Sequence, residues 1–541
     1  MIKDIRDFPG NDTEQLRAAA EWLRSNPGST LKLESRTYIL RDEAAAQLQQ
    51  KVMNGEYGAN CEEALFNRDF RYSVGLDLTG AENVTFDGNG ATILSDGYME
   101  TLSLKNCRNV KVKNVNFDLK RKAFSRGKIL AVKEDGMFVR FPEQTDISER
   151  MPADRMYIYS TGEERFTYCV GHGKIRQTDP ETLFFSGTYD RDSVGNELYV
   201  WHCFHFRPMI LIYESENTVL QDVKIFNNCG MGIVGHRSRD IFIRRLMVIP
   251  SPGYGMSTNT DATHFSSCRG KLRFENCIFE GQGDDATNVH TYYHTILEKT
   301  GDRCLITTLA PTGTHCQKPD HPEPGDIMEL CTKATLTYLD KYTVTAVEPD
   351  ENSRSALGDP WSWWITLDRP LPEDCDDKYL ADVSAMPELE FTGCSVRNNI
   401  ARGVLIKTRN ALVEGCLFDC GTSSAVHIAA EAYWHEGVSA QNVTVRNNRI
   451  IRRGPLNRYG AMWDAGGICI NVASDVPPCP VHKNIVIENN QIVCPDTPRA
   501  IYAADTDGLT IRNNEISSGK KGEEIFVTRC ENVVEEGNRI C

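Results

Sequence analysis

The sequence predicts an all-β fold, a right-handed parallel β-helix with an N-terminal capping helix and two β-rich insertions. The first reason is a short unit of alternating apolar residues, followed by Asn, Gly or Cys, that returns at residues 83–88, 109–114, 442–447 and 484–489. The second is the step between neighbouring copies, often 22 to 26 residues. Short strands with such a period indicate a solenoid, whose coils bury apolar residues by stacking on one another. The third is length, because 541 residues exceed an ordinary single core.

The predicted elements follow in chain order. Asp12-Thr13-Glu14-Gln15 has a capping-box pattern that predicts a helix through Leu23, which would cover the open end of the solenoid. In two stretches apolar and polar residues alternate as they do in strands, but the repeat is missing. We expect both stretches to be insertions and the second to be barrel-like. The predicted divisions are the cap and first coils in 1–118, an insertion in 119–210, the coils with the candidate site in 211–290, an insertion in 291–388, and the last coils in 389–541.

Composition limits the classes of partner and compartment. The hydrophobic share of 40% and the charged share of 25% are typical of soluble proteins, and the chain has no run of 18 apolar residues that predicts a membrane span. A net charge of −15 argues against nucleic acid and anionic membranes as partners. The start lacks a secretory signal, which predicts a cytoplasmic protein as written, or a periplasmic or secreted one if a leader was removed. The 19 cysteines are expected to be reduced thiols inside the solenoid, and the oligomeric state stays open.

Two segments with the same Asp-Ala-Thr pattern form the candidate catalytic site. Residues 259–264 and 283–288 are 24 residues apart, about one coil, so we expect Asp261, Asp284 and Asp285 to stack on one face. Coils about 4.8 Å apart bring the charges close enough to raise one pKa, so that one aspartate stays protonated as an acid while the others activate water. A structural or calcium-binding cluster is the alternative. Calcium needs more oxygen ligands than this segment supplies, and no Cys or His spacing supports zinc, so no metal or cofactor is predicted.

The strands after the aspartates can be aligned coil on coil. Residues 286–290 then lie over 403–407, 425–429 and 467–471, and 232–236 precede them. The second and fourth positions of this unit are mostly apolar and should face inward, whereas the third and fifth should face outward. The outward column is polar and rich in histidine, which predicts that it lines a sugar-binding cleft. The candidate substrate-binding residues are His236, His264, Asn288, His290, Lys407 and His427.

These motifs resemble two families of glycoside hydrolases. Asn259-Thr260-Asp261, Gly283-Asp284-Asp285 and residues 403–407 resemble motifs of the polygalacturonases, family 28. The stretch from Ser251 through His290 is similar to the α-1,3-galactosidases of family 110. That resemblance implies an inverting exo-hydrolase of terminal α-1,3-linked galactose, as in blood-group B and linear α-galactosyl antigens, without a metal. It also implies Asp284 as general acid, with Asp261 and Asp285 as the pair that activates water.

Departures from the polygalacturonase pattern favour a neutral sugar over a uronic acid. Leu405 stands where that family has an arginine for the substrate carboxylate, although Arg402 and Arg409 are near. Gly171-His172-Gly173 comes too early to be the glycine–histidine motif of that family. The alternatives left open are a polygalacturonase-like hydrolase, a polysaccharide lyase, and a non-catalytic carbohydrate-binding β-helix. In each case the expected partner is a glycan.

Overall fold

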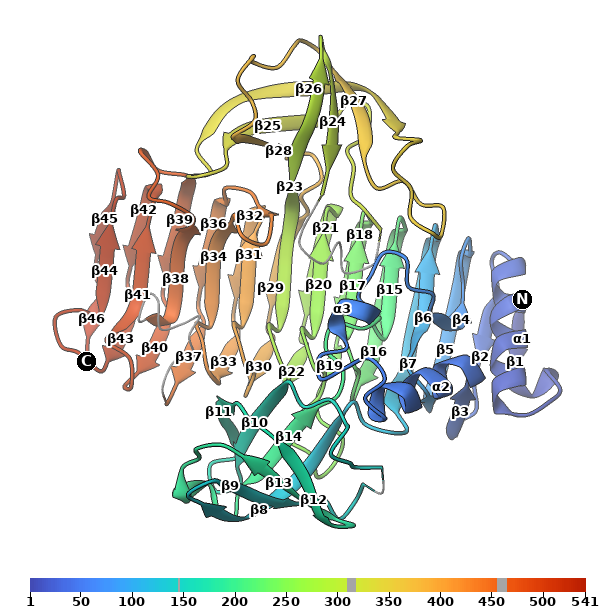
Figure 1. Ribbon diagram of the computed structural model, residues 1–541. Helices are drawn as coiled ribbons and strands as arrows, with labels where there is room; N and C mark the ends of the chain where they lie inside the picture. The colour runs from blue at the N-terminus through green and yellow to red at the C-terminus, as the bar shows by residue number, and fades with distance from the viewer. Residues whose placement is uncertain (145, 309–317, 455–464) are drawn as a thin grey trace.

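A computed structural model of the chain describes residues 1–144, 146–308, 318–454 and 465–541. The fold class is as predicted, a parallel β-helix with a minor helical cap and two β-rich insertions (Figure 1). Within the described residues no helix is long and apolar enough to cross a membrane. The predicted divisions at 291–388 and 389–541 contain residues 309–317 and 455–464, which lie outside the described part.

Three runs of parallel strands make the coils, and one of them, the site sheet, carries the candidate site. The site sheet consists of β4 (Ser73–Asp77), β6 (Met99–Lys105), β15 (Ile210–Tyr213), β17 (Ile233–His236), β20 (Thr263–Ser266), β23 (Thr287–Thr300), β31 (Val404–Lys407), β34 (Val426–Glu431), β38 (Ala465–Ala473), β41 (Arg499–Ala504) and β44 (Ile525–Thr528). Each strand pairs in parallel with its neighbour in this order.

The other two runs share several long strands. The second run consists of β1 (Ile2–Asp4), β2 (Thr30–Lys32), β5 (Glu82–Asp96), β7 (Arg108–Leu119), β16 (Glu216–Ile225), β18 (Arg239–Arg244), β21 (Arg269–Glu275), β29 (Glu388–Thr392), β32 (Arg409–Glu414), β36 (Gln441–Arg446), β39 (His482–Glu488), β42 (Thr506–Arg512) and β45 (Val534–Glu536). The third consists of β3 (Thr37–Arg41), the later halves of β5, β7 and β16, then β19 (Met247–Val248), β22 (Ile278–Glu280), β30 (Ser395–Arg397), β33 (Leu417–Cys420), β37 (Arg449–Arg452), β40 (Gln491–Cys494), β43 (Glu515–Ser518) and β46 (Arg539–Ile540).

The recurring asparagines have two separate tasks in the coils. Asn442 and Asn484 adopt φ of 55° and 53°, the left-handed region that asparagine tolerates, and so turn the chain at the corner. The Asn484 amide donates to Asn442 Oδ1 at 3.1 Å, one coil away. Inside the solenoid, Asn490 donates to Asn514 Oδ1 and to the carbonyl of Val445, at 3.0 and 2.9 Å. The repeat therefore places asparagines whose side chains form hydrogen bonds from coil to coil and pair the polar groups at the bends.

The cap starts one residue earlier than predicted. In α1 (Asp12–Ser25) the N-cap is Asn11, which exchanges hydrogen bonds with Glu14 in a capping box. Asp12 instead accepts from the Ile39 amide of the edge strand β3 at 3.0 Å, so its carboxylate joins the cap to the first coils. Among the described residues, the other helical segments are α2 (Glu43–Met53), α3 (Glu62–Leu65), η1 (Ile5–Asp7) and η2 (Arg191–Ser193).

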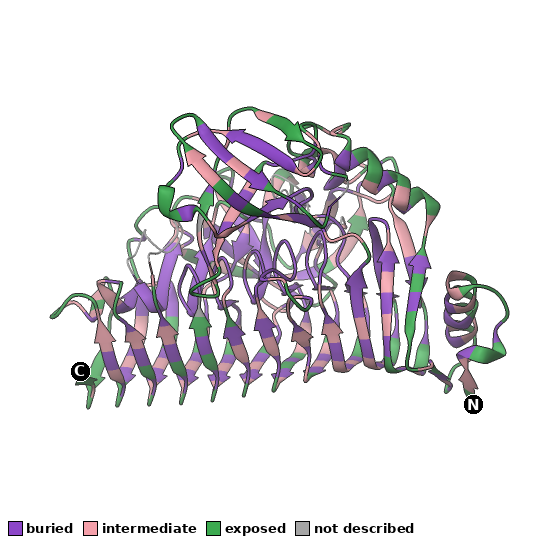
Figure 2. Cartoon of the chain, turned by 90° about the horizontal axis from the view of Figure 1, so that it is seen from below, coloured by how far each residue is buried: buried purple, intermediate pink, exposed green. Residues whose placement is uncertain are grey.

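The cysteines behave as small apolar residues in the coils. The described cysteines are thiols rather than disulfides, and most of them are buried. The Cys394 thiol accepts from the Cys277 amide and the Cys416 thiol from the Cys394 amide, both at 3.4 Å. One buried core then continues through the coils from Ile5 to Ile516, as the purple bands of Figure 2 show.

The two insertions extend from the coils at opposite ends of their strands (Figure 1). The first is an antiparallel sheet in the order β11-β10-β14-β8-β9-β13-β12. Its strands are β8 (Phe124–Lys133), β9 (Gly136–Arg140), β10 (Arg155–Ser160), β11 (Arg165–Val170), β12 (Ile175–Asp179), β13 (Thr182–Ser186) and β14 (Glu197–Trp201). The second is an antiparallel barrel closed by the outer half of β23, with β24 (Arg303–Thr307), β25 (Ile327–Thr332), β26 (Tyr338–Pro349), β27 (Trp363–Leu367) and β28 (Lys378–Asp382).

Candidate active site

The strand register stacks the two Asp-Ala-Thr motifs as the sequence alignment predicts. Thr263 of β20 pairs with Thr287 of β23, so Asp261 and Asp285 occupy equivalent places on adjacent coils. The Asp285 amide donates to Asp261 Oδ1 at 3.1 Å. One carboxylate oxygen each from Asp261, Asp284 and Asp285 lies within 4.8 Å of the others. We name these three residues the aspartate cluster.

Burial and mutual repulsion separate the roles of the three carboxyl groups. Asp261 and Asp285 are buried, whereas Asp284 is half-buried and is the member that solvent reaches. Burial, followed by the charge of Asp285, raises the pKa of Asp284 to about 7. Burial and the charges of Asp284 and Asp285 also raise the pKa of Asp261 well above its usual range. A carboxyl group with a pKa near neutrality is suited to donate a proton at physiological pH.

Asp285 is held by an arginine to which sequence reasoning gave no role in the cluster. The backbone N–H and the side-chain Nε of Arg402 both donate to Asp285 Oδ1 at 2.8 Å, and Nη2 donates to Oδ2 at 2.8 Å. Nη1 donates to Glu431 at 3.1 Å. A bidentate guanidinium neutralises the carboxylate and fixes its plane. Arg402 directly precedes the aligned unit 403–407, and that position in the repeat is the only sequence signal that could have indicated it.

Asn259 of the first motif anchors the first insertion rather than facing the cluster. Its amide nitrogen donates to the carbonyls of Ala123 and Cys203, at 3.3 and 2.6 Å, where the insertion leaves and rejoins the coils. Gly283 lies against the same insertion, because a Cβ there would be 2.5 Å from the Trp201 ring and 2.3 Å from the Asn259 carbonyl oxygen. The motif glycine is therefore required by close packing beside Asp284.

An aromatic wall from the first insertion lies next to the aspartate cluster. Trp201 stacks on Phe204 with ring centroids 5.4 Å apart, and the centroid of the Tyr157 ring lies 4.8 Å from that of Trp201. The guanidinium of Arg155 lies 3.6 Å from the centroid of the Phe204 ring. Trp201 and Phe204 are both buried, so these rings support the cluster from behind. None of these four residues was predicted, because the insertion carries no repeat to place them.

His264 and His290 lie directly behind Asp261. Nδ1 of His264 is 2.7 Å from Asp261 Oδ2, and its Nε2 is 2.7 Å from Nε2 of His290. His290 Nδ1 donates to the Thr291 carbonyl at 2.8 Å. Both imidazoles are almost fully buried. The structure thus brings together two of the predicted substrate-binding histidines, with their ring nitrogens bonded to protein groups.

Asn288 and Lys407 belong to a buried ion network with two glutamates that the sequence did not indicate. Asn288 donates to Glu436 Oε2 at 3.0 Å, and the Lys407 ammonium bonds Glu431 and Glu436. Although burial acts to lower it, the two glutamates raise the pKa of Lys407 above its usual value. Glu436 belongs to the short strand β35 (Glu436–Gly437), which pairs antiparallel with β23 and has no repeat signature. We name these four residues the ion network.

His236 and His427 lie at the two ends of the outward column. His236 Nδ1 is 2.8 Å from Ser266 Oγ, and its ring stacks on Tyr213 with centroids 5.7 Å apart. His427 Nε2 donates to Asn471 Oδ1, and burial lowers the pKa of His427 to about 4. These hydrogen bonds lead to other side chains of the site sheet rather than to the aspartate cluster.

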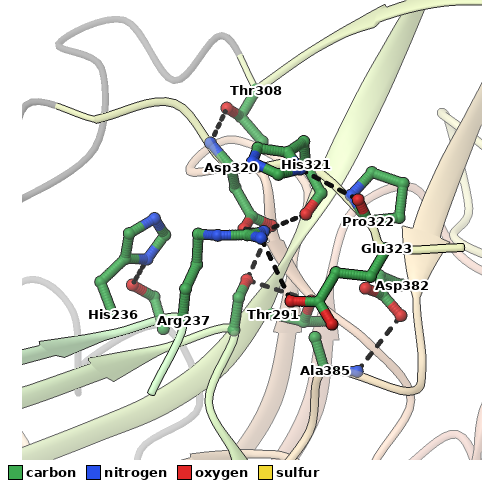
Figure 3. Close-up of polar contacts among 12 residues, drawn as sticks. His236, Arg237, Thr291, Thr308, Asp320, His321, Pro322, Glu323, Asp382 and Ala385 are labelled. Carbon is green, nitrogen blue, oxygen red and sulfur yellow. Dashed lines mark hydrogen bonds and ion pairs between the residues drawn. The ribbon is translucent and has the colours of Figure 1, made fainter. Parts of the chain in front are cut away.

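The barrel docks on the site sheet beside His236, at one end of the outward column. Arg237, which follows β17, bonds Asp320 Oδ1 at 3.3 Å, the His321 carbonyl, and Glu323 at 3.4 Å (Figure 3). Burial acts to raise the pKa of Asp320, but His236, His294 and Arg237 overcome it and lower that pKa to about 2. The ionised carboxylate therefore fastens the barrel over the site sheet.

Two groups of described residues have the composition of metal sites, the aspartate cluster and the trio of His264, His290 and Glu436. The aspartate cluster fits a calcium ion poorly, because Arg402 occupies both oxygens of Asp285 and calcium takes six to eight oxygen ligands. In the trio, the two histidines are already bonded to each other through their Nε2 atoms.

No protein-family model matches the chain. It is 26% identical over 538 residues to α-1,3-galactosidase A of Bacteroides fragilis, covering 94% of this chain and 84% of the relative. It is 27% identical over 568 residues to α-1,3-galactosidase B of Phocaeicola vulgatus, covering 95% and 88%. A family 28 exopolygalacturonase of Yersinia enterocolitica aligns with 99% of this chain and 78% of its own, at 12% identity and a TM-score of 0.38. The resemblance to α-1,3-galactosidases is therefore confirmed over nearly the whole chain.

Proposed function

We propose that this protein is an exo-acting α-1,3-galactosidase that releases terminal galactose from blood-group B or linear α-galactosyl glycans with inversion. The observation that carries the proposal is the aspartate cluster. Its most accessible member, Asp284, has a pKa of about 7, and two buried carboxyl groups lie within 4.8 Å of it. Asp284 would protonate the glycosidic oxygen, and Asp261 and Asp285 would hold and deprotonate the attacking water.

Protein groups hold both carboxylates that would activate the water. Arg402 occupies both oxygens of Asp285. The oxygens of Asp261 are bonded to the Asp285 amide and to His264. These partners fix the planes of the two carboxylates, which keep lone pairs with which to accept a hydrogen bond from a water.

The spacing of the cluster differs from the expectation for inversion. An inverting enzyme is expected to separate its carboxyl groups by about 6.5–9.5 Å. In this structure one oxygen of each aspartate lies within 4.8 Å of the others, close to the value for retaining enzymes. Coil stacking brings Asp261 beside Asp285, and Asp284 directly precedes Asp285 in the chain, so the acid lies close to both members of the base pair. The inverting assignment therefore rests on the resemblance of residues 251–290 to family 110, and the anomer experiment decides it.

A neutral sugar is favoured over a uronic acid by the arginines near the site. Arg402 is bonded to Asp285 and Glu431. Arg409 forms a bidentate pair with Glu329 of the barrel at 3.0 and 2.7 Å. Leu405 is buried in the position that aligns with the polygalacturonase arginine. Arg402 and Arg409, the two arginines nearest Leu405 in the sequence, are thus engaged with carboxylates of the protein.

The test offers the enzyme three substrates: α-1,3-galactobiose, the branched B trisaccharide and polygalacturonate. We expect galactose from the first two and no product from the third. NMR of the first-formed sugar should show the β-anomer, whereas the α-anomer would refute inversion and these roles. Hydrolysis of polygalacturonate alone would refute the substrate class. Full activity of the Asp284→Asn variant would favour a non-catalytic cluster and a different site.

A further inference from the structure

Asp261, His264 and His290 form one unbroken hydrogen-bonded chain. It runs from Asp261 Oδ2 to His264 Nδ1 at 2.7 Å, from His264 Nε2 to His290 Nε2 at 2.7 Å, and from His290 Nδ1 to the Thr291 carbonyl at 2.8 Å. The three residues are at most 4% exposed. We call these three residues the histidine relay.

The number of protons in the relay follows from its bonds. A carbonyl only accepts, so His290 Nδ1 carries a proton. One further proton must lie between the two Nε2 atoms, and one must lie between His264 and Asp261. The relay therefore holds three protons, one more than two neutral imidazoles and a carboxylate hold. This extra proton can reside on Asp261, on His264 or on His290 without breaking a bond of the chain.

Charges at both ends of the relay decide where the extra proton resides. At the far end, Glu436 Oε1 lies 3.7 Å from His290 Nε2 and favours an imidazolium there. Asn288 and Lys407 bond that glutamate in turn and moderate its charge. At the near end, Asp284 and Asp285 disfavour a charged Asp261, whereas Arg402 favours it. The extra proton is thus shared between a carboxyl group and an imidazole next to a second carboxylate.

A metal ion is the competing occupant of the space between the histidines. Nε2 of His264, Nε2 of His290 and a Glu436 oxygen lie within 4.8 Å of one another. The two Nδ1 atoms are bonded to a carboxylate and a carbonyl, as in metal-bound histidines. The two Nε2 atoms are, however, 2.7 Å apart, a hydrogen-bond distance, whereas two ligands at about 2.1 Å from tetrahedral zinc would be about 3.4 Å apart. The Lys407 ammonium on Glu436 also opposes a second cation.

We propose that the histidine relay holds a proton, not a metal ion, and that His264 and His290 are positioning residues that keep Asp261 ionised as the base while Asp284 stays protonated. The inference rests on the proposed function and adds to it a reason why Asp261 is the base. Both carboxyl groups are in surroundings that favour protonation, yet the reaction needs one of each form. With the extra proton on His290, Asp261 is a carboxylate and His264 donates to it.

The proton balance of the reaction then closes. The water oxygen bonds the anomeric carbon as one water proton passes to Asp261. The bond from that carbon to the glycosidic oxygen breaks, and Asp284 gives its proton to the leaving oxygen. Afterwards Asp261 returns a proton to Asp284, whose oxygen lies within 4.8 Å, through one bridging water.

The first test is the pH profile of the His290→Gln variant. Glutamine can accept from His264 Nε2 but cannot hold a proton, so the extra proton remains between His264 and Asp261. We expect the acid limb of the kcat/KM profile to move up by about one pH unit and kcat at pH 6 to fall about tenfold, with KM changed less than about twofold. His482→Gln is the matched control, since His482 is buried in the last coils and bonds the Asn471 carbonyl. An unchanged profile in His290→Gln overturns the proposal.

The second test is a joint neutron and X-ray structure of the wild-type enzyme, with metal analysis of the same sample. One deuteron is expected between the two Nε2 atoms. A metal at that place, with activity lost to a chelator and restored by zinc, overturns the proposal. The neutron structure needs no substrate, so it tests the relay independently of the proposed function. A deuteron at that place in an enzyme that releases no galactose refutes the proposed function while the relay stands.

Discussion

Arg402 holds Asp285 from the next coil, with three donors each 2.8 Å from a carboxylate oxygen. The guanidinium of Arg402 also bonds Glu431, which in turn bonds Lys407 of the ion network. Through this pair the charge of Asp285 stays buried beside Asp284 and raises the pKa of the acid. The pair therefore connects the ion network to the chemistry of the cluster.

Replacing Arg402 by lysine should abolish most of the activity. An ammonium cannot bond both oxygens of Asp285, and a buried carboxylate without its partner is costly. We expect kcat/KM for α-1,3-galactobiose to fall at least about 100-fold, with far-ultraviolet circular dichroism unchanged. Arg409→Lys is the control, because Arg409 forms a similar bidentate pair with Glu329 of the barrel. Equal losses in the two variants would count against a specific role of Arg402.

Asp284→Asn should separate substrates by their leaving groups. A natural galactoside needs a proton on its departing oxygen, so its turnover should fall by about 1,000-fold or more. An aryl galactoside with an acidic phenol needs no acid and should keep most of its rate. Asp261→Asn and Asp285→Asn should lose both substrates, because the water is then not activated. A comparison of kcat for the two substrates in all three variants makes the measurement, and equal loss of both in Asp284→Asn would contradict its role.

The pH dependence of catalysis should follow Asp284. The acid must be protonated, so kcat for the natural substrate should decline as pH rises through about 7, the pKa of Asp284. The aryl substrate should lack this alkaline limb. Profiles of kcat for both substrates over a range of pH test this, and a shared alkaline limb would assign it to another group.

The stability of the fold should depend on the same carboxyl group. The folded state keeps a proton on Asp284 up to about pH 7, whereas the unfolded chain loses it near 3.8. This contribution to stability is fully present below the unfolded pKa and is lost as pH rises through about 7. The melting temperature of Asp284→Asn relative to wild type should therefore rise between about pH 5 and pH 8. A difference that stays constant with pH would show that Asp284 is not protonated in the folded enzyme.

Gly283→Ala should damage the site without disturbing the coils. The new methyl group would press on the Trp201 ring and on the Asn259 carbonyl, directly beside Asp284. We expect kcat/KM to fall about 10- to 100-fold, with the melting temperature lowered by only about 2 °C. Gly162→Ala is the matched change in the first insertion, because a Cβ there meets open space. Normal activity of Gly283→Ala would mean that the aromatic wall is free to move.

Arg237→Ala should loosen the barrel from the site sheet. The Arg237 side chain is 6% exposed, and its removal leaves the buried carboxylate of Asp320 without its guanidinium partner. Limited proteolysis should cut the barrel faster in this variant. Activity should also fall, because water would then reach the side chains of the outward column. Arg239→Ala removes an exposed charge two residues away and should leave both properties as in the wild type. Equal cutting rates would show that other contacts hold the barrel.

The coils could be predicted from the sequence because the same residues follow two periods at once, the alternation of side chains along a strand and the repeat from coil to coil. Strand alternation fixes which side chains of residues 286–290 face inward, and the repeat fixes which residues lie on the neighbouring coils. The observed pairing of Thr263 with Thr287 and of Asn288 with Leu405 follows from both. The stacking of Asp261 over Asp285 could be read from the sequence for the same reason.

The rest of the site depends on segments that carry no period. Glu436 reaches Lys407 from a two-residue strand that pairs antiparallel with β23. Trp201 arrives at Gly283 from the end of an insertion. The docking of the barrel beside His236 was unpredictable as well, since it depends on the contact of Arg237 with Asp320. The roles of the predicted site residues remain predictions for the variants above to test.

Asn259 takes no part in the proposed chemistry, yet its amide has a consequence for how the enzyme could diversify. Because one nitrogen bonds the carbonyls of both Ala123 and Cys203, the first insertion departs and returns at a single point. The insertion therefore occupies the place in the coil that a short turn would otherwise occupy. Loop sequences of any length could be exchanged there at little entropic cost, since chain closure is already provided. The insertion can thus vary as an interchangeable module while the carboxylates on the coils keep their places.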